Sequence, residues 1–294
     1  MKVIFTCGGT AGHVNPALAL AGYMRKKDPT VEVLFVGTPE GIERDLVAQA
    51  GYDYRGIAVG SLERSVSWEA IRHNCKSAWE MLALRRKTGA ILKEFPADLV
   101  VGTGGYASYP MVKYAALRGI PTAVHEANMI PGLTTKMLEK HASRIMVGFE
   151  ECRALYKHPE RIAVTGTPVR GDFFDLTHEE AKAALGVGKD EPLVVSFWGS
   201  LGASTMNGQM LDFFKKEKED GYPFYHIHAV GGRGWETMQQ EMQKAGLPGS
   251  HKLDVRKYIY DMAVVMRAAD LVICRAGAST ISEITALAVP TIIV

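Results

Sequence analysis

Short apolar runs alternate with longer helical patterns along this chain, and the alternation runs through the sequence twice. In the first half the apolar runs are Val3–Cys7, Val31–Gly37, Leu99–Thr103, Thr122–Glu126 and Ile145–Phe149. In the second half they are Leu193–Trp198, Phe224–Val230, Lys252–Val255, Leu271–Arg275 and Thr291–Val294. Continuous apolar strands separated by helices are typical of parallel sheets that are covered on both faces. The sequence therefore predicts an α/β protein with two Rossmann-like domains.

Helical patterns fill the stretches between these strands. In the first half they are Pro16–Lys27, Glu40–Ala50, Trp68–Glu94, Tyr109–Leu117 and Gly132–His141, and in the second Glu179–Leu185, Thr205–Lys218, Gly234–Ala245, Met262–Ala268 and Thr280–Leu287. A strand that leads into a Gly- and Pro-containing turn, at Ile162–Arg170, predicts the break between the domains, which we expect to span residues 1–164 and 165–294. Ligands of open parallel sheets bind beyond the carboxyl ends of the strands. Glycine turns in both domains are therefore expected to line an interdomain cleft.

Composition excludes several classes of protein. A net charge of +2 over 294 residues gives no bias toward nucleic acid. The four cysteines are scattered without CxxC spacing, which argues against a zinc site or a disulfide framework and fits a cytosolic compartment. The N-terminus lacks the pattern of a signal peptide, and no run reaches the roughly 18 apolar residues that a membrane span needs. Any membrane contact is therefore expected to be peripheral.

A glycine-rich turn follows the first strand, with the sequence Gly8-Gly-Thr-Ala-Gly-His13 before Val14-Asn15-Pro16. Pro16 is expected at the first position of a helix, whose free N–H groups suit an anion. The turn does not match G-x-G-x-x-G or a P-loop, so the pattern alone fits a plain strand-to-helix turn equally well. His13 favours a functional site, because imidazole can accept a proton near neutral pH.

Two more strand ends of the first half carry glycine or polar residues. Gly102–Ser108 follows one strand as a second glycine turn, and His125-Glu126-Ala-Asn128 ends the next. By itself Glu126 fits a salt-bridge or capping role and Asn128 fits a helix N-cap. Three polar strand ends at one sheet edge are nevertheless better explained by a site.

The second half repeats this arrangement. Gly199-Ser-Leu-Gly-Ala203 lies between a strand and a helix and suits a diphosphate. Gly231-Gly232 follows the next strand, and Arg275 ends a later one, with Glu283 in the helix that follows. Glu283 fits either an acceptor for two ribose hydroxyls or an ordinary helix-start glutamate. No metal-ligand motif is present, so we expect no metal and no cofactor.

Ser61–Glu94 has a basic, amphipathic pattern. Its seven Lys and Arg residues outnumber four Glu, and apolar residues recur at helical spacing: Trp68, Ile71, Cys75, Trp79 and Leu82. A helix that faces the core is the default interpretation; a basic face edged by Trp also suits an anionic lipid surface.

Taken in order, these motifs resemble one family from the first strand to the last residue. The residues are Gly8–Pro16, Gly104–Tyr106, His125–Asn128, Thr165-Gly-Thr-Pro-Val-Arg170, Gly199–Ala203 and Arg275–Glu283. They are similar to the MurG family of UDP-N-acetylglucosamine–N-acetylmuramyl-(pentapeptide) pyrophosphoryl-undecaprenol N-acetylglucosamine transferases. The resemblance implies a GT-B fold, a metal-independent inverting transfer of N-acetylglucosamine from UDP-GlcNAc to lipid I, and a role in cell-wall synthesis. It also implies peripheral attachment to the cytoplasmic face of the bacterial cell membrane, with Ser61–Glu94 as the docking segment.

The resemblance also implies a role for individual residues. His13 is the expected general base, and Ala11, Gly12, Gly105 and Tyr106 are expected to face the acceptor. Thr10 and Asn128 are expected to contact the transferred sugar or the acceptor. The expected UDP-binding residues are Arg170, Ser200, Gly202, Ile259, Arg275 and Glu283, with Glu283 at the ribose and Ile259 near the uracil.

The chain departs from the family pattern in three places. Trp198 stands where the family has the first glycine of Gly-Gly-Ser-x-Gly-Ala, and Thr167 stands where it has Asn before Pro-Val-Arg. The chain also stops at Val294, inside an expected core strand, so the second domain is expected to be incomplete. Two alternatives to the transferase function remain open. The chain is either an inactive fragment that binds only acceptor and membrane, or an enzyme of the same fold with another activity, a UDP-GlcNAc epimerase or a glycolipid synthase.

Overall fold

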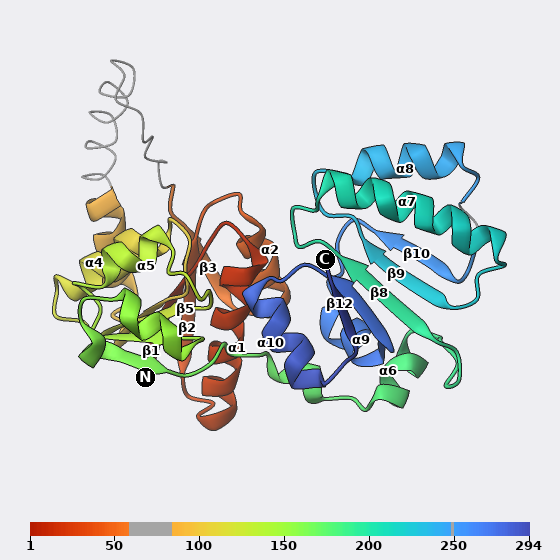
Figure 1. Cartoon of the computed structure of the whole chain (residues 1–294). Coiled ribbons are helices and arrows are strands. Elements are labelled where there is room, and N and C mark those ends of the chain that lie inside the picture. The colour runs from red at the N-terminus through yellow and green to blue at the C-terminus, as the bar shows by residue number, and fades with distance from the viewer. Residues whose placement is uncertain (59–83, 248–249) are drawn as a thin grey trace, which may run out of the picture. The chain divides into compact units, whose positions relative to one another are not determined.

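The computed structural model describes residues 1–58, 84–247 and 250–294, and these form two compact units (Figure 1). The first unit is Met1–Arg170 and the second is Gly171–Val294. Each is a parallel sheet with helices packed against it. The predicted fold class, with two Rossmann-like α/β domains, is confirmed; the assignment of 1–164 to the acceptor and 165–294 to the donor stays a prediction.

The first unit contains a seven-stranded parallel sheet in the order β3-β2-β1-β4-β5-β6-β7. Its strands are β1 Lys2–Thr6, β2 Glu32–Gly37, β3 Asp53–Gly56, β4 Leu99–Gly102, β5 Thr122–Glu126, β6 Arg144–Val147 and β7 Ile162–Val164. Its helices are α1 Ala11–Lys27, α2 Ile42–Gln49, α4 Ser108–Ala116 and α5 Leu133–Leu138, with 3₁₀ turns at Glu150–Leu155 and Pro159–Arg161. Residues 84–94 are also helical.

The second unit contains a five-stranded parallel sheet in the order β10-β9-β8-β11-β12. Its strands are β8 Leu193–Phe197, β9 Tyr225–Ala229, β10 Leu253–Arg256, β11 Leu271–Cys274 and β12 Thr291–Ile293. Its helices are α6 His178–Ala184, α7 Ser204–Glu219, α8 Trp235–Lys244, α9 Met262–Ala268 and α10 Ala278–Leu287, with a 3₁₀ turn at Gly171–Phe174. Helices α7 and α8 lie side by side over one face of the sheet (Figure 1).

Both sheets have a topological switch point, where the chain order reverses between two neighbouring strands. In the first unit this point lies between β1 and β4, and in the second between β8 and β11. Connections from such a strand pair leave toward opposite faces of the sheet, which opens a crevice at the carboxyl ends of the strands. The turns at Gly8 and Gly102, and those at Gly199 and Arg275, follow these strands directly.

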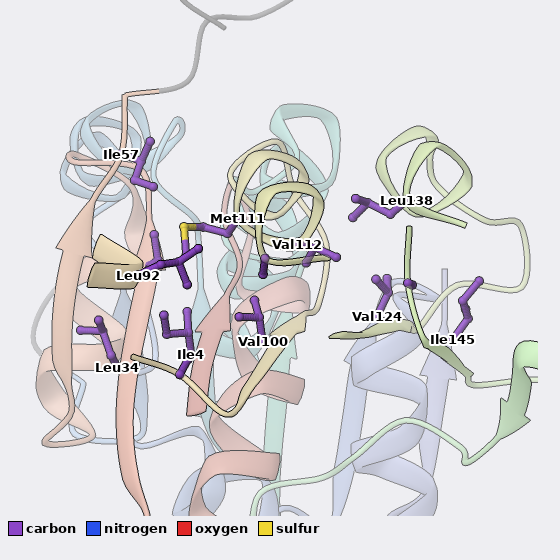
Figure 2. Close-up of a cluster of buried hydrophobic side chains, with 14 of the residues drawn as sticks. Ile4, Leu34, Ile57, Leu92, Val100, Met111, Val112, Val124, Leu138 and Ile145 are labelled. Atoms are coloured by element: carbon purple, nitrogen blue, oxygen red, sulfur yellow. The ribbon is translucent and has the colours of Figure 1, made fainter. Parts of the chain in front are cut away.

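Aliphatic side chains fill the space between the first sheet and its helices (Figure 2). Ile4, Leu34 and Val100 point from the strands toward Met111 and Val112 of α4, and Leu138 of α5 covers Val124 and Ile145 (Figure 2). These residues are at most 5% exposed. Burial at about 25 cal/mol per Å² of apolar surface stabilises the sheet–helix layers and fixes where each strand ends.

The structure corrects one helix boundary that bears on the site. Helix α1 begins at Ala11, so Pro16 lies inside it and not at its first position. The Thr10 carbonyl accepts the N–H of His13 at 3.0 Å and of Val14 at 3.3 Å, which closes the first turn upstream of the proline. Pro16 only removes one later N–H donor from the helix. His13 therefore lies in the first turn of α1.

Most of the predicted basic segment Ser61–Glu94 lies outside the described residues, which resume at Leu84. In the part that is described, Arg85, Arg86 and Lys87 are exposed and Leu84 is buried. Among the described residues, no helix has both the length and the apolar character to span a bilayer.

Candidate functional site

The glycine turns after β1 and β4 contact each other closely. A Cβ atom on Gly105 would overlap the carbonyl of Gly8, and one on Gly104 would lie 2.5 Å from Cδ2 and 2.9 Å from Nε2 of His13. The Thr103 hydroxyl donates to the His13 carbonyl at 2.7 Å. The two turns predicted to share an edge therefore form one surface, and glycine is required where they meet.

Side-chain hydroxyls join these turns to the ends of the strands. Ser108 Oγ lies 2.7 Å from the carbonyl oxygens of both Thr6 and Gly104. The Thr6 hydroxyl donates to the Ala107 carbonyl at 3.2 Å. Ser108, Thr6 and Ala107 are all fully buried. These buried hydrogen bonds hold the turn after β4 against the end of β1, while Tyr106 in the turn is 64% exposed.

The contacts of the His13 ring assign its proton. Nδ1 lies 2.8 Å from the Gly8 carbonyl oxygen, which can only accept a hydrogen bond. Nδ1 therefore carries the hydrogen, and the Thr10 hydroxyl at 3.4 Å from it is a weaker contact. Nε2 hydrogen-bonds none of the residues that the structure describes. A neutral imidazole in this tautomer offers Nε2 as a proton acceptor.

Glu43 of α2 lies beneath the first glycine turn and was missed by the sequence analysis. Its fully buried carboxylate accepts the N–H of Gly9 at 3.3 Å, the N–H of Thr38 at 2.8 Å and the Thr38 hydroxyl at 2.5 Å. Burial first, and the Glu43 charge second, raise the pKa values of Cys7 and Tyr54. The contact spans 34 positions, so the local pattern around α2 held no signal for it.

Glu126 at the end of β5 organises the next turn. One of its carboxylate oxygens accepts the N–H and the side-chain amide of Asn128, at 3.0 and 2.9 Å. The other accepts the N–H of Gly132 at 2.8 Å and the Thr135 hydroxyl at 2.7 Å. Asn128 is therefore not the N-cap of α5, whose N-cap is Gly132. Glu126 is a buried clamp that presents Asn128 at the surface.

His125 ties the same strand to the Thr165–Arg170 turn. Its Nε2 lies 3.1 Å from the Gly166 carbonyl oxygen, and burial lowers the pKa of this histidine. The ring is therefore neutral and serves as a donor to the turn. Arg170, at the end of this turn, is half-buried.

In the second unit, the turns after β8 and β9 also meet through glycines. A Cβ atom on Gly202 would overlap the Val230 carbonyl, and one on Gly231 would overlap the Gly202 backbone. The Gly232 N–H donates to the Ser200 carbonyl at 3.1 Å, and the Asn207 side chain donates to the Val230 carbonyl at 3.1 Å. The Gly202 N–H donates to the Gly199 carbonyl at 3.1 Å, so it is not one of the free donors that the motif suggested.

The other predicted donor residues lie beyond β11 and before α9. Arg275 is exposed directly after β11, and Glu283 is 6% exposed within α10. Burial, followed by the Glu283 charge, raises the pKa of Cys274 to about 11, which places that carboxylate near the end of β11. Ile259 is 1% exposed, so its side chain is part of the fold before any ligand binds.

A buried polar chain links β8, β9 and α7 inside the second unit. Glu217 Oε1 lies 2.6 Å from His226 Nδ1, and Ser196 Oγ lies 2.7 Å from His226 Nε2 and 2.6 Å from His228 Nδ1. Burial, with His226 as a second cause, lowers the pKa of His228 to about 3. These groups connect β8, β9 and α7 inside the unit, away from solvent.

The structure thus gathers Thr10, Ala11, Gly12, His13, Gly105 and Tyr106 around the first switch point, with Asn128 one strand further along. Ser200, Gly202 and Arg275 follow the strands of the second switch point. Their binding roles stay predictions. Among residues 1–58, 84–247 and 250–294, no group of three or more His, Cys, Asp or Glu side chains is arranged to hold a metal ion.

Both halves of the chain match known domains. Residues 3–147 match the glycosyltransferase family 28 N-terminal domain, and residues 193–294 match the glycosyltransferase family 28 C-terminal domain.

Two relatives are similar over the whole chain. One from Acetivibrio thermocellus is 42% identical, with all of this chain and 78% of the relative covered. One from Thermoanaerobacter sp. is 36% identical, with all of this chain and 79% of the relative covered. Both are named UDP-N-acetylglucosamine–N-acetylmuramyl-(pentapeptide) pyrophosphoryl-undecaprenol N-acetylglucosamine transferase.

Solved structures share the fold. The MurG of Acinetobacter baumannii is 24% identical with a TM-score of 0.61, covering 100% of this chain and 78% of that chain. A UDP-GlcNAc 2-epimerase from Neisseria meningitidis is 12% identical with a TM-score of 0.64, covering 100% and 82%. The fold alone therefore does not separate the two chemistries, but the sequence relatives do: the chain belongs to the MurG family of N-acetylglucosamine transferases, within glycosyltransferase family 28.

Proposed function

We propose that this protein transfers N-acetylglucosamine from UDP-GlcNAc to the lipid-linked acceptor lipid I, which forms lipid II in peptidoglycan synthesis. The observation that carries the proposal is the 42% identity over the full chain to a relative with that name. His13 Nε2, which hydrogen-bonds none of the described residues and lies beside two glycine turns at a switch point, supports the same chemistry.

In the proposed acceptor half, the C4 hydroxyl of the acceptor sugar attacks the anomeric carbon of N-acetylglucosamine. His13 Nε2 takes the hydroxyl proton as the new carbon–oxygen bond forms. The bond from the anomeric carbon to the diphosphate breaks, and its electron pair leaves with UDP. A single displacement inverts the anomeric configuration. Thr10, Gly105, Tyr106 and Asn128 hold the acceptor, with Ala11 and Gly12 contributing backbone.

In the proposed donor half, UDP is bound by residues at the second switch point. The diphosphate faces Ser200 and the start of α7, whose N-cap Ala203 supplies no side-chain cap. Arg275 offsets the negative charge that develops on UDP. Glu283 accepts the ribose hydroxyls, Ile259 supports the uracil and Arg170 completes the UDP contacts.

We also propose peripheral contact with an anionic membrane at the cytoplasmic face, and α5 supports it. Leu133 is 49% exposed and Met137 is 37% exposed on α5, with the exposed Lys136 on the same helix and the exposed Lys140 in the turn that follows it. Apolar side chains beside lysines suit the boundary between headgroups and acyl chains, where each lysine contributes about 1 kcal/mol. K136E/K140E should reduce binding to phosphatidylglycerol vesicles, while K215E/K216E on α7 should not. Equal binding by both double variants would contradict this surface.

The reaction is tested by measuring UDP release from UDP-GlcNAc by the 294-residue chain, with and without a lipid I analogue. We expect release that depends on the acceptor, with the disaccharide product detected by mass spectrometry. His13→Ala should lower turnover by about 10²- to 10⁴-fold, the usual contribution of a general base. His158→Ala, a change at a surface histidine of the same unit, serves as the control. UDP release without acceptor would favour an epimerase, and full turnover in His13→Ala would contradict the base assignment.

A further inference from the structure

The Gly8–Gly9 peptide group connects two side chains that do not touch. Its carbonyl oxygen accepts the Nδ1 hydrogen of His13 at 2.8 Å. Its N–H, on Gly9, donates to Glu43 Oε2 at 3.3 Å. Because the carbonyl and the N–H belong to one planar amide, the two hydrogen bonds act along the same conjugated group. A carboxylate, a peptide and an imidazole are thus linked in series.

We propose that Glu43 is a positioning residue for His13 and acts on it through the Gly8–Gly9 peptide. The carboxylate polarises the amide, which strengthens the Gly8 carbonyl as an acceptor, because hydrogen bonds in a chain reinforce one another. The stronger acceptor keeps the hydrogen on Nδ1 and leaves the Nε2 lone pair available. This inference rests on the proposed role of His13 as the base.

The surroundings of Glu43 fit this role. The carboxylate is fully buried, and Thr38 supplies two donors to Oε1, so Oε2 remains directed at Gly9. Cβ atoms on Gly8, Gly37 and Gly41 would each approach the Glu43 side chain within 3.0 Å. Three glycines therefore leave space for one carboxylate beneath the turn. A buried charge this closely enclosed needs all of its hydrogen-bond donors.

The proton balance at His13 follows from this arrangement. When Nε2 takes the acceptor proton, the ring becomes an imidazolium with hydrogens on both nitrogens. Nδ1 keeps its hydrogen and donates it to the Gly8 carbonyl, and the Glu43 charge at the other end of the peptide offsets the new positive charge. The proton then passes from Nε2 to solvent after UDP leaves.

The first test is the tautomer itself, measured by nitrogen NMR on the chain with labelled histidine at about pH 8, where an ordinary histidine is neutral. His13→Ala identifies the signal. We expect the hydrogen on Nδ1 in the wild type. In Glu43→Gln the population of that tautomer should fall, because a glutamine has one accepting oxygen and cannot serve both Gly9 and Thr38.

Glu139→Gln is the matched control for the loss of a buried carboxylate. Glu139 is also buried in the first unit and accepts two backbone N–H groups, those of Lys157 and His158, but it has no link to His13. It should leave the His13 signal unchanged. A hydrogen on Nε2 in the wild type, or identical His13 signals in Glu43→Gln and the wild type, would overturn the inference. The wild-type measurement decides this even where Glu43→Gln fails to fold.

The second test is kinetic. Glu43→Gln should lower kcat about 10- to 100-fold, less than the roughly 10²- to 10⁴-fold contribution of the base that it positions, while KM for UDP-GlcNAc changes far less. Glu139→Gln, which changes a buried carboxylate elsewhere in the first unit, should keep kcat. An unchanged kcat in Glu43→Gln would overturn the inference. Full turnover in His13→Ala would instead contradict the proposed base, and the NMR measurement separates these two failures.

Discussion

The imidazole of His13 lies against the Cα atom of Gly104, at a distance that no side chain at position 104 allows. A Cβ atom there would lie 2.5 Å from the ring carbon Cδ2. Gly104 also has φ = +112°, a backbone conformation that residues with a side chain rarely adopt. The turn after β4 therefore fixes one side of the ring, as the Gly8 carbonyl fixes its edge.

Gly104→Ala should displace the His13 ring and lower kcat by about 10²-fold, the loss expected for a catalytic group that moves by about 1 Å. Steady-state kinetics with both substrates measure this change. The matched control is Gly119→Ala, at φ = +74° with no atom within 4 Å of the added Cβ. It also places alanine at a positive φ, but without a collision and away from His13, so its kcat should hold. Equal kcat values in the two variants would contradict the role of the ring contact.

Glu126→Gln should destabilise the first unit by about 1–3 kcal/mol, because an amide NH₂ replaces one accepting oxygen and leaves a buried pair of donors unsatisfied. Urea denaturation measures the free energy of unfolding. Glu32→Gln, at an exposed position on β2, should change it by less than about 0.5 kcal/mol. Glu126→Gln should also raise KM for the acceptor, because Asn128 loses a carboxylate oxygen that accepts its two hydrogen bonds. Unchanged stability in Glu126→Gln would show that the clamp contributes nothing.

His228 should make the second unit sensitive to acid. Burial holds the pKa of His228 in the fold at about 3, below the ordinary histidine value of about 6.5. Between pH 6.5 and 3, therefore, only the unfolded chain takes up the proton. Above pH 6.5 this group has no effect, and the free energy of unfolding should fall by about 1.4 kcal/mol for each pH unit below it. The loss at pH 4 is on the order of 3 kcal/mol.

The measurement for His228 is the pH dependence of unfolding, in the wild type and in His228→Gln. The variant cannot titrate at this position, so its stability should fall less steeply below pH 6.5. The Ser196 hydroxyl, the His226 ring and the aromatic rings of Trp198 and Phe214 face His228 and remain in place. Parallel pH profiles for the two proteins would refute the buried neutral histidine.

Gly202→Ala should separate the turns after β8 and β9, since its Cβ atom would overlap the Val230 carbonyl. We expect UDP to bind at least about tenfold more weakly, a cost of about 1.4 kcal/mol, as measured by calorimetry. Gly221→Ala is the control, at φ = +75° with no atom within 4 Å of the added Cβ. If both variants bind UDP like the wild type, the Gly202 turn has no part in UDP binding.

Much of the fold could be predicted because the strands are buried on both faces. Runs such as Thr122–Glu126 and the helix Met262–Ala268 coincide with β5 and α9. β3 was missed because Asp53–Gly56 is a short, polar edge strand without an apolar run. The start of α1 was misplaced because proline preference at a helix start is local, whereas the Thr10 carbonyl bonds upstream of it decide the boundary.

The candidate site could be predicted only where its residues form a local motif next to the end of a strand. His13 and the glycine turns follow strands directly, so motif and topology point to them together. Glu43 reaches the turn of His13 through a tertiary contact and lies in no recognisable motif. Thr103 lies in the second glycine turn, but its bond to the His13 carbonyl is a tertiary contact that the motif does not predict. Glu126 was visible, but its role as a clamp depends on four donors that only the folded turn brings together.

The partner of His13 Nδ1 is a main-chain carbonyl, and this has a consequence for how the protein tolerates variation. No single substitution can delete that acceptor, whereas a side-chain partner could be lost by one codon change. Residues that move the Gly8 peptide can disturb it, and among the described residues Glu43 and Gly105 lie closest to that peptide. Selection that preserves the orientation of this histidine should therefore limit the residues accepted at positions 43 and 105. At position 8, the limit is the space available for a side chain beside Glu43.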